Sequence, residues 1–278
     1  MGSEDMKRLM NIEPSPVVKV FLTMLPFVIA VVVYWLASEA RLSENPNDKL
    51  LPSFTQIAAA VERYAFVENK RTGEYLFWQD SAASLWRIGL GIGISACVGL
   101  VVGMLNGLLP MVRAGLSPFI TILSLIPPMA ILPILFITFG LDELAKVMLI
   151  IIGTAPVIMR DMQSQVTQLP REQLIKAQTL GASTWLVAIR VVLPQILPRL
   201  LASVRLTLGA AWLFLIAAEA IAAQEGLGYR IFLVRRYMSM DVILPYVIWI
   251  TSLAFAMDFS LKKLSMLCFP WFHQGEAK

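Results

Sequence analysis

The stretch from Gln173 to Pro198, QLIKAQTLGASTWLVAIRVVLPQILP, is a polar, helix-forming island between two segments long enough to cross a bilayer. Glycine commonly follows the last residue of a helix, so Gly181 predicts the end of a first helix. Ser183 can accept the free backbone N–H groups at the start of a second helix, expected over residues 184–193. The island is therefore predicted to form two helices joined by a tight turn.

Both expected helices have an apolar face. The first carries Leu174, Ala177 and Leu180 on one side, and the second carries Trp185, Ala188 and Val192. Pro194 and Pro198 are expected to redirect the chain from the second helix into the next span. A rigid, half-apolar pair of helices suits docking of a partner protein. The alternative is a loop that packs only on its own chain.

The composition indicates an all-α polytopic membrane protein. Of the 278 residues, 58% are hydrophobic and 15% are charged, against roughly 45–50% and 25% in soluble domains. The excess apolar surface must face lipid, and a large soluble helical bundle is the competing interpretation. Cys97, Cys268 and the single histidine, His273, indicate neither a disulfide framework nor a metal site. The net charge of +4 fits basic residues that flank spans better than nucleic-acid binding.

Six transmembrane helices are expected, since about 20 apolar residues cross a bilayer. They cover residues 20–37, 84–109, 116–139, 144–159, 200–222 and 242–261. The chain then divides into a cytoplasmic tail (1–16), a first helix (17–38), an external loop (39–80), a five-helix core (81–264) with the loop 164–198, and a cytoplasmic tail (265–278). A cleaved signal peptide is the alternative for the first helix. Ser53 is expected to cap a short amphipathic helix in the external loop.

Basic residues in short loops predict that both termini lie in the cytoplasm. These residues are Lys7, Arg8, Arg113, Arg160, Arg171, Lys176, Arg190, Arg199, Lys262 and Lys263. The island would then also lie on the cytoplasmic side.

Glycines in the second span indicate close packing of two helices. Gly99, Gly103 and Gly107 recur every four residues, with Gly89 and Gly93 before them, and small residues at this spacing let backbones approach in lipid. A phosphate-binding loop over 89–93 is the rejected alternative, because no Gly-Lys-Ser/Thr follows.

Proline and charge mark a candidate solute path. Pro127, Pro128 and Pro133 must break or kink the third span, and broken backbone in a membrane is buried in protein or lines a wet cavity. A solute passage and a purely structural bend are both open. Glu219, deep in the fifth span, either belongs to the path or pairs structurally, with Arg87 as a candidate partner. Further candidate lining residues are Trp212, Asn106 and Ser124.

The island resembles the cytoplasmic loop of ABC importer permeases, whose pattern is Glu-Ala-Ala, three residues, Gly, nine residues and Ile-x-Leu-Pro. Residues 175–177, Gly181 and residues 191–194 align with this pattern. The chain departs from it at Ile175, where the family has Glu, and at Lys176, where a small residue is usual. Further pieces resemble the nitrate, taurine and aliphatic sulfonate branch: Leu51-Pro52-Ser53, Ser84-Leu85-Trp86-Arg87, Ile126-Pro127-Pro128, Leu132-Pro133, Phe139-Gly140, Ala145-Lys146, residues 218–223 and Gly226-Leu227-Gly228.

The resemblance implies the type I ABC importer permease (MetI-like) fold, with a cytoplasmic pair of coupling helices. The residues that would couple to an ATPase are Ile175, Lys176, Ala177, Thr179, Leu180, Gly181, Ala182, Ser183, Trp185, Val191, Leu193 and Pro194. The implied partners are a second permease copy in a homodimer, two cytoplasmic ATPase subunits that hold ATP and Mg, an external binding protein and membrane lipid. No catalytic residue, metal or cofactor is expected on this chain.

The expected function is ATP-driven import of a small polar solute, such as nitrate, taurine, a sulfonate or a urea- or guanidine-like compound, across a bacterial inner membrane. A secondary transporter driven by an ion gradient is the alternative. It predicts inverted repeats and paired charges at mid-membrane, which the sequence does not show. An intramembrane enzyme would need clusters of His, Cys or Asp within spans, which are also not seen.

Overall fold

The computed structural model describes residues 14–46, 48–69 and 73–273, and every regular element in these ranges is a helix. Residues 1–13 and 274–278 of the two tails predicted to be cytoplasmic lie outside the described residues. The helices are α1 (Pro16–Glu44), α2 (Phe54–Ala65), α3 (Leu76–Leu108), α4 (Pro110–Leu125), η2 (Pro128–Ile131), α5 (Leu132–Phe139), α6 (Glu143–Thr167), α7 (Arg171–Thr179), α8 (Thr184–Val187), η3 (Ala188–Val192), α9 (Leu193–Ala222), α10 (Leu227–Arg235), α11 (Met240–Cys268) and α12 (Pro270–His273).

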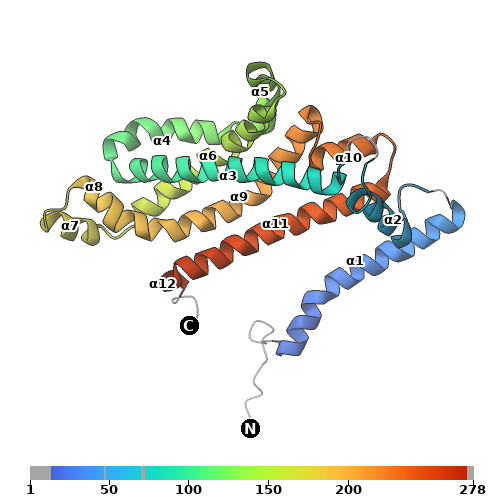
Figure 1. Ribbon diagram of the computed structural model, residues 1–278. Helices are drawn as coiled ribbons and strands as arrows, with labels where there is room; N and C mark the ends of the chain where they lie inside the picture. The colour runs from blue at the N-terminus through green and yellow to red at the C-terminus, as the bar shows by residue number, and fades with distance from the viewer. Residues whose placement is uncertain (1–13, 47, 70–72, 274–278) are drawn as a thin grey trace, which may run out of the picture.

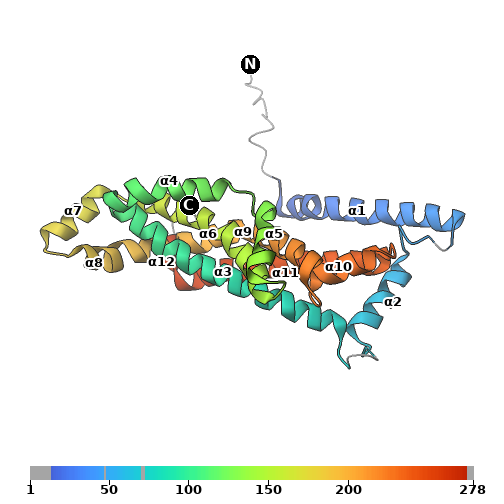
Figure 2. The same ribbon diagram turned by 90° about the horizontal axis from the view of Figure 1, so that it is seen from above.

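The long helices form an elongated bundle with two distinct ends. In both views α7 and α8 lie at one end, and α2 and α10 lie toward the other (Figures 1 and 2). α1 stands apart from the bundle, and its contact with the rest of the chain is made near its C-terminal end. There Tyr34 and Ser38 donate hydrogen bonds to the carbonyl of Pro52, at 2.7 and 3.3 Å. The predicted Ser53 cap of α2 is present, because the Ser53 hydroxyl accepts from the Gln56 amide at 3.2 Å.

A seam of small residues joins α3 to α6. A side-chain carbon added at Gly91, Gly99, Gly103 or Gly107 would lie 2.5–2.7 Å from a side chain of α6. Ser95 continues this four-residue step and receives a 2.8 Å hydrogen bond from Thr154. Close packing is thus confirmed, but Gly89 and Gly93 lie off the four-residue step, and a carbon added at either would meet nothing within 4 Å.

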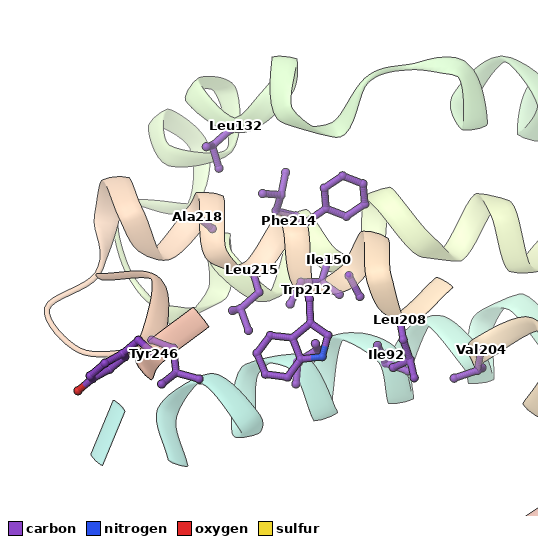
Figure 3. Packing of buried hydrophobic residues seen from close by; sticks show 14 of the residues in the cluster. Ile92, Leu132, Ile150, Val204, Leu208, Trp212, Phe214, Leu215, Ala218 and Tyr246 are labelled. Carbon is purple, nitrogen blue, oxygen red and sulfur yellow. The ribbon is translucent and has the colours of Figure 1, made fainter. Parts of the chain in front are cut away.

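The main core lies where α9 packs against α3 and α6. Figure 3 shows Trp212 of α9 lying among Leu208, Leu215 and Ile150. Because these three helices carry the core, they hold the polar groups at the two ends of the bundle at fixed positions.

The third predicted span is broken, as its prolines require. α4 ends at Leu125, and the helical segment from Pro128 to Phe139 turns away from it by 82°. Four helices are long and apolar enough to cross a membrane, and this bent pair would add a fifth. The predicted count of six is therefore not reached on length and composition, because α6, which contains the predicted fourth span, is not among them.

Several helices continue past the charged residues at which the predicted spans end. α3 begins at Leu76, within the stretch 39–80 that was predicted as the external loop. α6 runs on to Thr167 beyond Arg160, and α11 runs on to Cys268 beyond Lys263. At 1.5 Å per residue, the 33 residues of α3 span about 50 Å, which exceeds the ~30 Å of hydrocarbon. Polar residues can therefore lie inside a helix and outside the hydrocarbon.

The second helix of the island does not end near Leu193 as predicted. A continuous helix of 39 residues runs from Thr184 to Ala222. Its π-helical turn, η3, explains how Pro194 fits, because the Leu193 amide bonds the Ala188 carbonyl five residues earlier. The wider turn changes the hydrogen-bond register just before a residue that has no N–H to donate. Pro194 and Pro198 thus lie within this continuous helix, residues 184–222, which we call the rod. It joins the island directly to the core.

Candidate functional site

The turn between α7 and α8 is built by backbone hydrogen bonds around Gly181. The Ala182 amide bonds the Ala177 carbonyl at 3.0 Å, and the Gly181 amide bonds the Gln178 carbonyl at 2.9 Å. This pair of bonds is the Schellman motif, which needs a left-handed residue just beyond the helix. Gly181 has φ +82°, and a carbon added there would meet nothing within 4 Å. Glycine is therefore required for the backbone angle and not for space.

The second helix starts at the predicted cap, since the Ser183 hydroxyl accepts from the Leu186 amide at 3.3 Å. A small apolar cluster then holds the helix pair against the bundle. It contains Val187, Val192 and Ile196 with Met104 and Val166 of the seam helices, and Leu174, Ala177, Ala182, Val191 and Leu193 pack against it. Gln195 also donates to Gln173 at 3.1 Å, which ties α9 to α7. The pair is thus fixed to the rod.

The outward side of this helix pair is apolar and exposed. It carries Ile175, Leu180, Trp185, Leu186 and Ile189, which we call the tip surface. Two predicted faces were therefore wrong in part: Leu180 is 88% exposed and Trp185 is 67% exposed, whereas their predicted neighbours Ala177 and Ala188 face the bundle. Sequence spacing placed these residues on helices but did not show which side the bundle covers.

The opposite end of the bundle contains a buried charge network. Glu219 is fully buried on α9 and accepts a 2.7 Å hydrogen bond from Arg87 Nη1. Ser84 donates to it at 2.8 Å, and the Gly228 amide donates at 2.8 Å. Of the two interpretations left open for Glu219, pairing with Arg87 is the one observed here.

Arg87 links three further elements to this carboxylate. Its Nη2 donates to Glu143 of α6 at 2.8 Å, its Nε also contacts Glu143, and its Nη1 donates to the carbonyl of Glu225 at 2.9 Å. Glu143 precedes the predicted span 144–159 and also accepts from Lys146 at 2.6 Å. The hydrogen bonds from Arg87 are the main reason that the pKa of Glu143 is lowered to about 2. Arg87 therefore joins α3, α6 and the α9–α10 turn.

A second buried carboxylate, Asp80, adds α10 and α11 to the network. Arg230 Nε donates to it at 2.8 Å, the Gly226 amide at 2.9 Å and the Tyr246 hydroxyl at 3.1 Å. Asp80 is the last residue of the stretch predicted as the external loop, and it lies in the second turn of α3, where these bonds satisfy its charge inside the protein. Asp80, Ser84 and Arg87 are spaced by four and three residues, a helical spacing that could have revealed one polar face.

The Gly226-Leu227-Gly228 motif is explained by this network. Gly226 has φ +123°, and a carbon added there would lie 2.5 Å from Glu219 and 2.7 Å from Arg87. A carbon at Gly228 would lie 2.7 Å from the Ile216 carbonyl. Both glycines let the turn between α9 and α10 close over the ion pair.

Beside the network lies a depression of about 1240 Å³. It is bordered by Arg87, Glu143, Lys146, Glu225 and Arg230, together with apolar residues of α6, α9 and α10 such as Leu144, Ile221 and Leu233. A surface with both charge signs can contact a polar solute or a charged protein surface, so this end of the bundle is a second candidate contact region.

The candidate path residues are not gathered in one cavity. Trp212 is 4% exposed and packs in the core, and its Nε1 has no hydrogen-bond partner among the described residues. Asn106 is fully buried and donates to Gln163 at 2.6 Å. Both side chains are therefore enclosed by the helices of this chain. Ser124 lies at the helix break, where it accepts a 2.8 Å hydrogen bond from Arg160, and Pro127 is exposed there while Pro128 is half-buried.

Comparison with known proteins identifies the chain's relatives. Residues 93–265 match the family described as "Binding-protein-dependent transport system inner membrane component". The taurine transport system permease protein TauC of Escherichia coli K12 is 38% identical over 202 residues, 72% of each chain. The putative aliphatic sulfonates transport permease protein SsuC of the same strain is 31% identical over 95% of this chain and 98% of its own. The bicarbonate transport system permease protein CmpB of Synechococcus elongatus is 33% identical over 70% of each.

The fold has a counterpart among solved structures. A chain of the MetNI methionine ABC transporter, in an inward-facing conformation, superposes with a TM-score of 0.55 and 20% identity, over 66% of this chain and 93% of that one. This likeness concerns the fold alone, and it agrees with the predicted MetI-like arrangement. The family match and the relatives together show that the chain belongs to the binding-protein-dependent transport system inner membrane components, the permease subunits of ABC importers.

Proposed function

We propose that the chain forms the membrane path for a small solute with an anionic sulfonate or carboxylate-like head group, driven by a separate ATPase that docks on the tip surface. Relatives named for taurine, aliphatic sulfonates and bicarbonate support this solute class. ABC permeases work with ATPase subunits and a substrate-binding protein, and none of the relatives supports a secondary transporter. ATP and Mg would then be held by the ATPase.

The observation that carries this proposal is the tip surface itself. A soluble surface rarely leaves Trp185, Leu180 and Ile175 exposed together on a short element, and such apolar patches mark interaction sites. The tip is rigid, because the Gly181 turn and the small apolar cluster fix it to the rod that continues as α9. A movement imposed on the tip is therefore passed to the membrane part.

The opposite end then faces the outside, and the depression beside Arg87 and Glu143 is a fitting place for the binding protein to deliver solute. This orientation puts both termini in the cytoplasm. A second copy of the permease is proposed to complete the path, since the broken backbone at Pro127 is exposed in the single chain and needs protein or water around it in a membrane. We propose the bacterial inner membrane as the location.

The test compares two tryptophans that are equally exposed. Trp185 lies on the tip surface and Trp86 lies on α3 near the opposite end, and each is 67% exposed. We expect Trp185→Ala to lower the binding-protein-stimulated ATPase activity of the reconstituted complex about tenfold or more, because exposed aromatic anchors dominate docking energies at ≥ ~2 kcal/mol. Trp86→Ala should stay near the wild-type value.

Uptake of taurine, an alkanesulfonate and bicarbonate by the same proteoliposomes tests the solute class. Equal loss of stimulated ATPase activity in both tryptophan variants would show that the tip surface is not the docking site. Uptake of uncharged solutes alone would refute the anionic class while leaving the docking result unaffected.

A further inference from the structure

A second cavity lies at the tip end of the bundle, where α9 and α11 meet α12. Its volume is about 400 Å³, within the ~300–1,000 Å³ of ligand pockets. Its lining residues are Pro198, Ala202, Arg205, Lys262, Ser265, Met266, Phe272 and His273. The lining therefore combines basic groups with apolar side chains and contains no carboxylate.

The cavity lies most of a membrane thickness away from the buried charge network. Along α9, the 14 residues from Arg205 to Glu219 span about 21 Å, and along α11 the 16 residues from Tyr246 to Lys262 span about 24 Å. The hydrocarbon of a bilayer is about 30 Å thick, and long basic side chains extend from inside it toward the head groups. If the charge network lies at one membrane surface, two separate helices place these basic groups within reach of the lipid head groups of the other surface.

Of the two long basic side chains in the cavity, only Arg205 is paired with an acid among the described residues of the protein. Lys262 is exposed and forms no ion pair or hydrogen bond within the part of the chain that the structure describes. Arg205 donates to Asp258 through Nε at 2.8 Å and Nη2 at 3.0 Å, which leaves its Nη1 available. Because Asp258 is the acid beside Arg205 and Lys262, these three groups leave one net positive charge at the mouth of the cavity.

Aromatic residues of the last turn complete the site. The guanidinium of Arg199 lies 5.6 Å from the centre of the Phe272 ring, which itself lines the cavity. Trp271, beside it on α12, is half exposed, and tryptophan concentrates at the interface between hydrocarbon and head groups. The cavity thus has an apolar wall for glycerol and acyl carbons and a basic mouth for a phosphate.

We propose that this cavity binds the phosphate of an anionic phospholipid in the leaflet on the tip side, with Lys262 as the main contact and Arg205 as the second. Basic pockets between helices at this level are suited to phospholipid head groups, and each lysine near the surface adds attraction for anionic lipid. The site holds α9 and α11 together at the point where the rod enters the membrane. It shares no residue with the tip surface or with the depression beside Arg87 and Glu143.

The neighbouring lysine provides a matched control. Lys263 is also exposed, but it lies over Phe259, 6.0 Å from the ring centre, and does not line the cavity. The detergent-purified complex is titrated with phosphatidylglycerol, phosphatidylcholine and, separately, inorganic phosphate, and bound lipid is counted by native mass spectrometry. We expect Lys262→Gln to weaken phosphatidylglycerol binding about fivefold, as one lysine predicts, whereas Lys263→Gln and Lys262→Arg remain within twofold of wild type.

Four results would overturn the proposal. Equal losses for Lys262→Gln and Lys263→Gln would mean that only the general surface charge matters. Displacement of phosphatidylglycerol by millimolar inorganic phosphate would identify a site for free phosphate and not for lipid. A crosslink from Lys262 to a second copy of the chain would show that protein fills the cavity. Phosphatidylcholine binding as tightly as phosphatidylglycerol would likewise remove the case for an anionic head group.

Discussion

The two polar ends of the bundle differ in how completely their charges are paired. At one end Arg87, Asp80 and Glu219 are buried, and each makes several hydrogen bonds to other elements. At the tip end Lys262 is exposed and has no ion pair among the described residues, and the apolar tip surface is exposed as well. The first end is complete within one chain, whereas the second still presents charged and apolar groups to partners.

This difference indicates which end of the bundle stabilises the fold and which end is available to bind partners. A buried ion pair with one partner missing is costly, so the charge network ties α3, α6, α9, α10 and α11 into one arrangement. The unpaired Lys262 and the exposed apolar tip surface can instead be stabilised by a partner outside the chain. Under the proposed function, the first end would hold the helices together while the tip end contacts the ATPase.

The largest expected effect is from Glu219→Gln. This change keeps the shape of the side chain but removes the fully buried acid that pairs with Arg87, which should cost about 3–5 kcal/mol. Thermal unfolding of the detergent-solubilised protein, followed by fluorescence-detected size exclusion, measures the loss. Glu225→Gln is the control, because its carboxylate is 44% exposed and lies 3.7 Å from Arg87, and it should cost less than about 1 kcal/mol. Equal melting temperatures for the two variants would show that the buried charge network does not stabilise this end of the bundle.

The next effect concerns the seam that connects the two ends. Gly103→Ala places a carbon 2.6 Å from Met162 Cβ and 2.7 Å from the Met159 carbonyl, and overpacking of this kind costs about 1–3 kcal/mol. Gly93→Ala, on the same helix but with nothing within 4 Å, should be neutral or should stabilise by about 0.5–1 kcal/mol. The two variants differ only in position, so their melting temperatures in one detergent compare the seam with the lipid-facing side. A Gly103→Ala protein as stable as Gly93→Ala would mean that the helices separate freely.

Features governed by one or two local residues could be predicted from the sequence. Gly181 and Ser183 predicted the turn between α7 and α8, Ser53 predicted the cap of α2, and Pro127-Pro128 predicted the helix break. Each follows from a backbone rule that acts over a few neighbouring positions. The family resemblance extended this to the MetI-like fold, because it depends on the order of many short pieces.

Features that depend on which helices meet could not be predicted. Asp80 reads as a loop residue until Arg230, 150 positions later, is placed beside it. The side of the island that carries Trp185 depends on which face the bundle covers. The passage of Pro194 through a continuous rod depends on a π-helical turn for which the sequence has no clear signal. In each case the decisive partner is distant in sequence or is the backbone itself.

The smallest effect, and the sharpest test of the comparison, is from Asp258→Asn. Its ion pair with Arg205 is partly exposed, with side-chain exposures of 39% and 29%, and pairs of this kind contribute about 0.2–1 kcal/mol, less at high salt. We expect a small loss in melting temperature that shrinks as salt is added, and tighter binding of phosphatidylglycerol because Arg205 is released toward the cavity. Thermal unfolding at low and high salt and native mass spectrometry measure these two effects on one variant. If Asp258→Asn cost as much stability as Glu219→Gln, the ion pair at the tip end would stabilise the protein as strongly as the buried charge network does. The contrast between the two ends of the bundle would then be refuted.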